Sequence, residues 1–254
     1  MIKLHCIASG SKGNASLIFD DKTLILVDLG ITKERLIEGL NEIGKTIEDI
    51  QFAFFTHDHS DHIKNYYFID ENKRYALSKT IPLKKENVLK AYNEYTFNTF
   101  KVIPLKTSHD ASSPCGFLFI NGLEKLAYIT DTGKIDKLTL KYINNADYYY
   151  FESNYNDEML INSGRPQILI NRIMSNKGHL SNDQSAYYLS LLIGPNTKKV
   201  MLCHLSEECN TEEVALDTHY EAYNKLGIDI SNIEFKCAKQ WESVDLWLKL
   251  IFIA

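Results

Sequence analysis

The chain has 254 residues, of which 44% are hydrophobic and 24% are charged, and its formal net charge at pH 7 is −5. This length can bury a substantial core, and we interpret residues 1–254 as a single α/β domain. The negative charge argues against a protein that holds nucleic acid by bulk charge alone, although bound divalent metals and a local basic patch would still permit such contact.

The cysteines and the apolar segments indicate a cytoplasmic protein. Five cysteines are scattered without a C-x-x-C pair, which favours reduced thiols. We expect Cys6, Cys115 and Cys203, which lie in apolar runs, in the core. The chain has no apolar stretch of membrane-spanning length and no signal-peptide pattern, so we expect no membrane association. The apolar residues 247–254 are predicted to be a packed terminal strand or a subunit contact, and the oligomeric state stays open.

The first part of the chain predicts strands around a loop of small residues. Strands are expected at residues 2–8, 15–19 and 24–27, followed by a helix from Thr32 to about Gly44. The loop is Ser9-Gly10-Ser11-Lys12-Gly13-Asn14. Backbone N–H groups in such a loop can approach an anion closely. We therefore predict Ser9, Ser11 and Asn14 as phosphate-binding residues.

A histidine-rich loop is the main functional signal. It follows an apolar run at residues 52–55 that predicts a buried strand, and it has the pattern H-x-H-x-D-H: His57, His59, Asp61 and His62. Imidazole nitrogens mixed with carboxylate oxygens suit zinc and its first-row neighbours. A strand directly before the loop would fix the geometry of these ligands.

Residues 63–101 are harder to interpret. We predict a helix from about residue 63 to 70 and another around residues 84–94. The segment is rich in basic residues, which are either a solvated surface or a track for phosphates. These residues are Lys73, Arg74, Lys79, Lys84, Lys85, Lys90 and Lys101.

The second half alternates strands and helices. Strands are expected at residues 99–106, 116–120, 125–129, 148–154, 199–203 and 233–237. Helices are expected at residues 135–144, 181–193 and 211–226, with a polar helical stretch before residue 175. Ser181 and Gln184 form an S-x-x-Q capping box, which marks the start of the second of these helices.

Potential ligands recur where predicted strands end. They are Asp28, His57, His109, Asp131 and His204. Such residues converge at one edge of the sheets, and they predict two adjacent metal sites that can share a hydroxide nucleophile. One site would contain His57, His59 and His109, and the other Asp61, His62 and His204, with Asp131 bridging both. Asp28 is predicted to hold the histidine loop through hydrogen bonds, whereas His5 and His219 have no partner pattern.

These motifs resemble the metallo-β-lactamase superfamily. S-G-S-x-G-N, S-H-D-A, T-D-x-G, E-S-N, G-H-L-S-N and H-L-S-E-E-x-N are similar to the YycJ (WalJ) group, a relative of ribonuclease Z and ribonuclease J. The resemblance implies an αββα sandwich of two mixed β-sheets flanked by helices. It also implies two divalent ions, zinc or manganese, and 5′-to-3′ exonuclease action on DNA. The chain has no room for the separate domain inserted in ribonuclease J.

The resemblance also suggests roles for His179 and Ser181. His179 matches a histidine that lies beside the scissile phosphate in ribonuclease Z-like enzymes, and a helix N-terminus just after it favours an anion. We expect Asp61 to accept or orient the proton of the nucleophile, His179 to assist the leaving oxygen, and Ser181 to bind phosphate. Two alternatives stay open, a thioester or lactone hydrolase on the same fold and a non-catalytic metal-binding scaffold.

Overall fold

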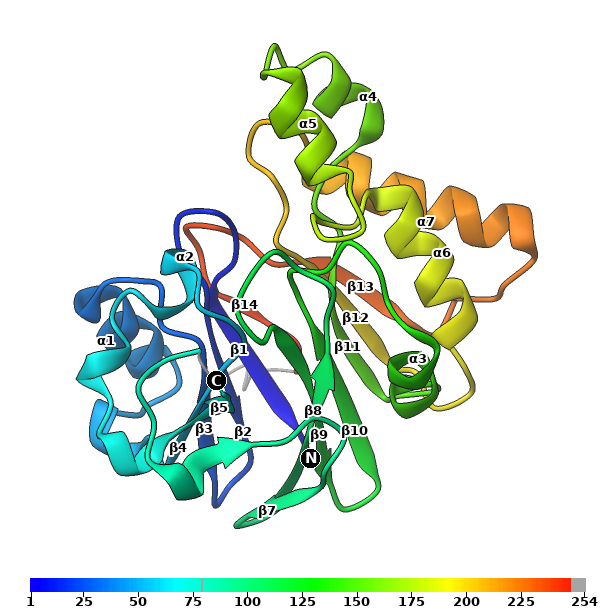
Figure 1. Ribbon diagram of the computed structural model, residues 1–254. Coiled ribbons are helices and arrows are strands. Elements are labelled where there is room, and N and C mark those ends of the chain that lie inside the picture. Colours follow the sequence, from blue (N-terminus) through cyan, green and yellow to red (C-terminus); the bar gives the residue numbers. More distant parts are fainter. Residues whose placement is uncertain (79, 248–254) are drawn as a thin grey trace, which may run out of the picture.

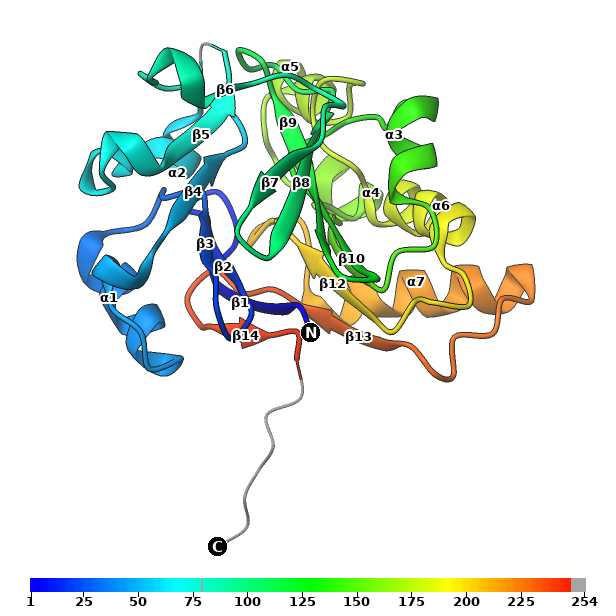
Figure 2. The same ribbon diagram turned by 90° about the horizontal axis from the view of Figure 1, so that it is seen from below.

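The computed structural model describes residues 1–78 and 80–247. Two seven-stranded sheets lie against each other, with α1 and α2 outside one sheet and α3, α6 and α7 outside the other (Figure 1). The predicted αββα sandwich of two mixed sheets is confirmed. The view from below shows both sheets between their helices (Figure 2).

The first sheet comes from the N-terminal part of the chain and one short C-terminal strand. Its order is β14-β1-β2-β3-β4-β5-β6. The first three sequential strands pair antiparallel, whereas β3 to β6 run parallel. The strands are β1 (Lys3–Ala8), β2 (Ala15–Phe19), β3 (Leu24–Val27), β4 (Phe52–Phe55), β5 (Arg74–Leu77), β6 (Val88–Leu89) and β14 (Val244–Asp245).

The second sheet mirrors this arrangement. Its order is β13-β12-β11-β10-β9-β8-β7, with antiparallel pairing from β7 to β10 and parallel pairing from β10 to β13. The strands are β7 (Tyr95–Phe97), β8 (Phe100–Lys106), β9 (Cys115–Asn121), β10 (Glu124–Ile129), β11 (Tyr148–Glu152), β12 (Lys199–Cys203) and β13 (Glu234–Cys237).

The helices cover the outer faces and form one projection. They are α1 (Lys33–Glu42), α2 (Ser60–Ile63), α3 (Lys137–Ile143), α4 (Asp157–Ile161), α5 (Gln167–Ile173), α6 (Asn182–Leu192) and α7 (Glu212–Leu226). Short 3₁₀ turns lie at Ile47–Asp49, Tyr66–Phe68, Glu71–Lys73 and Lys85–Asn87. The pair α4–α5 projects from the end of the sandwich where α2 lies (Figure 1). No helix within residues 1–78 and 80–247 is long and apolar enough to cross a membrane.

An aromatic core joins the two sheets. Phe54 of the first sheet packs edge-on against Phe117 of the second, with ring centroids 5.4 Å apart. Tyr128 and Tyr150 stack at 4.3 Å, and the Tyr128 hydroxyl donates to Ser16 across the interface. All five cysteines are free and buried, which confirms the core position predicted for three of them. This packing holds the strand ends of both sheets in a fixed relation.

The helix predicted around residues 84–94 is wrong. This segment contains a 3₁₀ turn and then β6, which pairs with β5, a strand that we did not predict. Leu89 joins the core between the sheets, and Tyr92 has a left-handed backbone with φ 63° that no α-helix contains. Sheet pairing and burial therefore outweigh the helix propensity of the lysines and glutamates.

The helix predicted from residue 63 to 70 is also wrong beyond its first residue. The helix α2 ends at Ile63 because Asn65 leaves the helical path, donating from its backbone to Leu29 and from its side chain to Ile31. A 3₁₀ turn follows. At the other end of the chain, Trp247 packs edge-on against Phe19 at 5.1 Å, whereas residues 248–254 of the predicted terminal strand lie outside the described residues.

Candidate metal centre

The predicted ligands lie together at one end of the sandwich. Asp28 follows β3, the histidine loop follows β4, His109 follows β8, Asp131 follows β10 and His204 follows β12. Asp28, Asp131 and His204 all have positive φ, at 60°, 51° and 57°. Residues other than glycine rarely adopt this conformation, and such strain gathers at functional sites. The sharp exit from each strand aims these side chains at a common point.

Both predicted triads have the proximity that a shared metal needs. The potential ligand atoms of His57, His59 and His109 lie within 4.8 Å of one another, and so do those of Asp61, His62 and His204. His109 Nε2 is 3.2 Å from His59 Nδ1. His62 Nε2 is 3.5 Å from Asp61 Oδ2. Tetrahedral metal sites in proteins use such nitrogen and oxygen sets.

Asp131 lies between the two triads. Its Oδ2 is 3.2 Å from His62 Nε2, and its Oδ1 is 3.8 Å from His109 Nε2. Oδ1 also lies 3.4 Å from His204 Nδ1. The side chain is buried. Oδ1 therefore lies near one histidine of each triad and Oδ2 lies near His62, so the carboxylate is close to ligands of both triads.

Asp28 lies against the histidine loop and contacts both His62 and Thr56, the residue before the loop. Its carboxylate lies 2.8 Å from His62 Nδ1, and it accepts hydrogen bonds from the backbone N–H and the hydroxyl of Thr56. This leaves His62 Nε2 directed at Asp131 and Asp61. A carboxylate on the far nitrogen of a ligand histidine fixes both its tautomer and its ring orientation.

Two ring nitrogens of the cluster are buried without a hydrogen-bond partner among the described residues. These atoms are His57 Nε2 and His204 Nε2. An unsatisfied buried polar atom is costly, because it has lost its water and gained nothing in exchange. Coordination of a cation would satisfy both atoms. The donor set therefore fits a bound metal.

The electrostatics of the cluster divide its histidines into two classes. Burial lowers the pKa of His57 well below its ordinary value, and burial also lowers the pKa of His109. Burial opposes protonation of His204, but Asp131 and Glu152 raise its pKa to about 9. In the same way, Asp131 and Asp28 overcome burial and raise the pKa of His62. The raised pKa values favour the protonated forms of His62 and His204. A metal ion that bound to these rings would therefore displace protons from them.

Glu152 belongs to the cluster, although we did not predict it. It ends β11, and its Oε1 lies 2.8 Å from His179 Nδ1 and 3.1 Å from His204 Nδ1. Its Oε2 accepts a hydrogen bond from the backbone N–H of Thr132. Burial alone would raise the pKa of Glu152, but the facing His179 lowers it, so the carboxylate stays charged. Its position at a strand end was the signal that could have found it.

The loop at residues 9–14 lies against the candidate ligands and forms hydrogen bonds with them. The Ser9 hydroxyl accepts hydrogen bonds from Tyr150 and from the backbone N–H of His204. Asn14 donates to the Asp61 carbonyl and lies 3.0 Å from His62 Nε2. Ser9 and Asn14 are buried, whereas Ser11 is exposed. Phosphate binding by this loop stays a prediction, with Ser11 as its accessible hydroxyl.

Gly30 allows this loop and the histidine loop to meet. A Cβ at Gly30 would lie 1.7 Å from the Asp61 carbonyl oxygen. The Gly30 N–H donates to Asn14, and the Asn14 N–H donates to Asp61. A side chain at this position would therefore displace the backbone of a candidate ligand.

Several of the basic residues at positions 73–101 are engaged within the protein. Lys73 Nζ donates to the Ile50 carbonyl, and Arg74 Nε donates to the Ile69 carbonyl. Lys84 pairs with Glu71, and Lys101 pairs with Glu94. Lys79 lies outside the described residues. For these four residues, the contacts favour the interpretation as a solvated surface over that as a track for phosphates.

Fold and donor set together define a class, the metallo-β-lactamase fold with a divalent metal site. A family model described as "Beta-lactamase superfamily domain" matches residues 23–205, and the chain belongs to this family. The chain is therefore an enzyme, a metal-dependent hydrolase, as predicted.

The chain is also similar to individual proteins of this fold. The chain is 32% identical over 241 residues to "Exodeoxyribonuclease WalJ" of Streptococcus pneumoniae serotype 2 (strain D39 / NCTC 7466), covering 88% of each chain. It is 32% identical over 222 residues to "Exodeoxyribonuclease YycJ" of Bacillus anthracis, covering 82% of this chain and 84% of the relative. The metallo-β-lactamase fold protein YhfI from Bacillus subtilis superimposes with a TM-score of 0.71 at 15% identity, over 96% of this chain and 99% of that one. The predicted resemblance is confirmed.

Proposed function

We propose that this protein is a metal-dependent phosphodiesterase that degrades DNA as a 5′-to-3′ exonuclease. The observation that carries the proposal is the pair of ligand triads joined by Asp131, with the ring of His179 beside them. The relatives named as exodeoxyribonucleases support DNA as the substrate.

The proposal assigns two divalent ions, zinc or manganese, to the two triads. His57, His59 and His109 would hold one ion, and Asp61, His62 and His204 would hold the other. Asp131 would contribute an oxygen to each. The ions would supply activation of a water nucleophile and stabilisation of charge on the phosphate oxygens.

Asp61 is proposed to accept or orient the proton of the attacking water. Its side chain is 23% exposed, whereas the side chains of His62 and Asp131 beside it are closed to solvent. Asn14 Nδ2 donates to Asp61 Oδ2 at 3.4 Å, which leaves the other oxygen for the nucleophile. A carboxylate that is held on one side and open on the other suits a general base.

His179 is proposed to stabilise or protonate the leaving oxygen. Its Nδ1 is held by Glu152, and its ring is centred 5.1 Å from the rings of His109 and His204. With Nδ1 occupied, Nε2 is the atom available to a substrate. The ring is 17% exposed, so it lies at the boundary between the cluster and solvent.

The direct test is cleavage of end-labelled single- and double-stranded DNA and RNA by protein reconstituted with zinc or manganese. We expect stepwise shortening of DNA from the 5′ end, with about a hundredfold or greater loss of kcat in Asp61→Ala and in His179→Ala. The His179→Ala protein should keep its metal, because the proposed triads do not include that ring. Hydrolysis of acyl esters but not of bis-p-nitrophenyl phosphate by the metal-loaded protein would contradict the proposal.

A further inference from the structure

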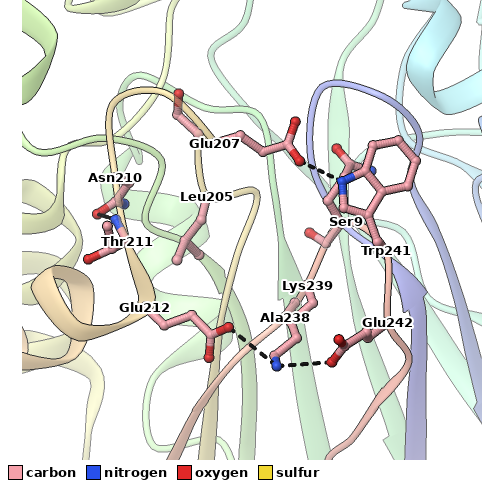
Figure 3. A pocket seen from close by; sticks show the side chains of 12 residues that line it. Ser9, Leu205, Glu207, Asn210, Thr211, Glu212, Ala238, Lys239, Trp241 and Glu242 are labelled. Atoms are coloured by element: carbon pink, nitrogen blue, oxygen red, sulfur yellow. Dashed lines mark hydrogen bonds and ion pairs between the residues drawn. The ribbon is translucent and has the colours of Figure 1, made fainter.

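A cavity lies beside the candidate metal centre. It has a volume of about 320 Å³ and lies between the segment after His204 and the loop that joins β13 to β14. Its lining includes Leu205, Ser206, Glu207, Lys239 and Trp241. Figure 3 shows Trp241 and Ser9 on one side of the cavity, with Asn210, Thr211 and Glu212 across from them.

The cavity shares its wall with the metal centre. Ser9 lines it, and the Ser9 hydroxyl accepts a hydrogen bond of 2.8 Å from the backbone N–H of His204. Leu205, which also lines it, follows His204 directly, so their Cα atoms are about 3.8 Å apart. A chain molecule with one unit at the metal centre could therefore place a neighbouring unit in this cavity.

Trp241 is exposed and makes one hydrogen bond across the cavity. The residue is 67% exposed, and its indole N–H donates to Glu207 at 2.6 Å. This hydrogen bond to the Glu207 carboxylate favours one orientation of the ring (Figure 3). A large aromatic ring that is open to solvent is a surface on which a flat ligand can stack.

The loop that carries Trp241 is attached to the loop behind the metal centre. Gln240 accepts a hydrogen bond from the Lys12 N–H and donates one to the Gly13 carbonyl, and the Ser9 N–H donates to the Lys239 carbonyl. Asn14, one residue further, contacts Asp61 and His62. The position of Trp241 is therefore coupled to that of the candidate ligands through one short segment.

The charges in the cavity select against a phosphate. Its lining carries the carboxylates of Glu207, Glu212 and Glu242 and one cation, Lys239. Lys239 pairs with both Glu212 and Glu242, at 3.5 and 3.0 Å. An uncharged flat group with N–H hydrogens suits such a lining, because carboxylates accept hydrogen bonds from the N–H groups of bases.

We propose that this cavity is a nucleobase-binding subsite, in which Trp241 stacks on the base of a nucleotide that neighbours the scissile phosphate. This inference rests on the proposed action on a nucleic acid strand. It adds a specific contact to a base, whereas the metal centre contacts only the phosphate. Stacking tolerates every base, as degradation of arbitrary DNA requires.

Steady-state kinetics on two substrates test the subsite. One is a short single-stranded oligodeoxynucleotide, and the other is a strand of equal length and charge that is abasic at every position. In Trp241→Ala, the ratio of kcat/KM on the normal strand to that on the abasic strand should fall about 5- to 100-fold. Trp241→Phe should restore most of the ratio. Leu123→Ala, an exposed apolar residue in the β9–β10 hairpin, is the control and should keep the wild-type ratio.

Fluorescence gives a readout that does not depend on turnover. The chain has two tryptophans, so Trp247→Phe leaves Trp241 as the only tryptophan, which is excited selectively at a wavelength where tyrosine does not absorb, and Asp61→Ala prevents cleavage. The normal strand should quench the emission of this double variant, and the abasic strand should not. Equal quenching by both strands, or an unchanged kinetic ratio in Trp241→Ala, would overturn the subsite while wild-type cleavage of DNA upholds the proposed function. A wild-type protein that does not cleave DNA, together with a double variant that shows no quenching by either strand, would overturn both.

Discussion

Two of the regions that bury histidines in this molecule do so in opposite ways. At the strand ends, His57 and His204 each leave one buried nitrogen without a hydrogen bond, and carboxylates surround the cluster. Between α6 and α7, His219 is equally buried, but Nδ1 donates to the Ala215 carbonyl and Nε2 lies 3.2 Å from the Ser185 hydroxyl. The comparison shows that burial alone does not mark a functional histidine. What distinguishes the cluster is that its unsatisfied nitrogens lie among several other potential ligands, both histidines and carboxylates.

Removing the carboxylate between the triads should give the largest effect. In Asp131→Ala we expect loss of metal, measured by elemental analysis, and a fall in phosphodiesterase activity of about a thousandfold or more, because the groups of such a centre act as a unit. The matched control is Asp217→Ala on the exposed face of α7, which should keep both properties. Two metals per chain and full turnover in Asp131→Ala would contradict the bridging position.

The folding stability should depend on pH in the direction expected for His219, a buried histidine that is neutral and hydrogen-bonded. Burial lowers the pKa of His219 from 6.5 to about 4. Above pH 6.5 the ring is neutral in both the folded and the unfolded chain. As the pH falls from 6.5 towards 4, only the unfolded chain takes up the proton, so folding stability is lost. The loss amounts to about 3 kcal/mol, at about 1.4 kcal/mol for each pH unit.

Urea unfolding at several pH values measures this effect. Wild type and His219→Gln are compared with chelator present, so that titration of the metal centre is common to both. The free energy of unfolding of wild type should fall by about 3 kcal/mol more than that of the variant between pH 6.5 and 4. Parallel curves would show that His219 does not stay neutral in the folded protein.

The same contrast explains which parts of the site the sequence predicts. Ligands such as Asp28 and Asp131 come directly after apolar runs, so their place at a sheet edge is a local property. The hydrophobic pattern likewise predicts β2, β3 and the β9–β10 hairpin closely. In contrast, β6 has only two residues and exists because β5 lies beside it. No local pattern reports such a pairing.

Local sequence patterns also cannot predict residues whose partners are distant in the sequence. Glu152 lies 27 positions before His179 and 52 before His204, which it contacts. Gln240 meets the loop at Gly13 across 227 positions. These contacts depend on which loops the two sheets bring together. Ser9 and Asn14 were predicted as anion-binding residues because a small-residue loop suits an anion, but their side chains are turned inward by partners that only the fold supplies.

Ser181 lies between the metal cluster and the region around His219, and its substitution should have the smallest effect of these predictions. It begins α6, the helix whose Ser185 contacts His219 one turn later, and it follows His179 by two residues. Its hydroxyl accepts a hydrogen bond from the Gln184 N–H, and the Gln184 side chain accepts one from the Ser181 N–H. As a helix cap, the hydroxyl should contribute about 1 kcal/mol to stability.

Ser181→Ala therefore separates two roles for one hydroxyl. If the hydroxyl caps the helix, the free energy of unfolding falls by about 1 kcal/mol and KM for DNA changes little. If it binds phosphate, KM rises about 10- to 150-fold, since a hydrogen bond to a charged group contributes about 1.5–3 kcal/mol. Ser181→Thr is the matched control, because threonine keeps both the cap and a hydroxyl donor. We expect the first result, because the hydroxyl is buried and already bonded to the helix that begins beside it.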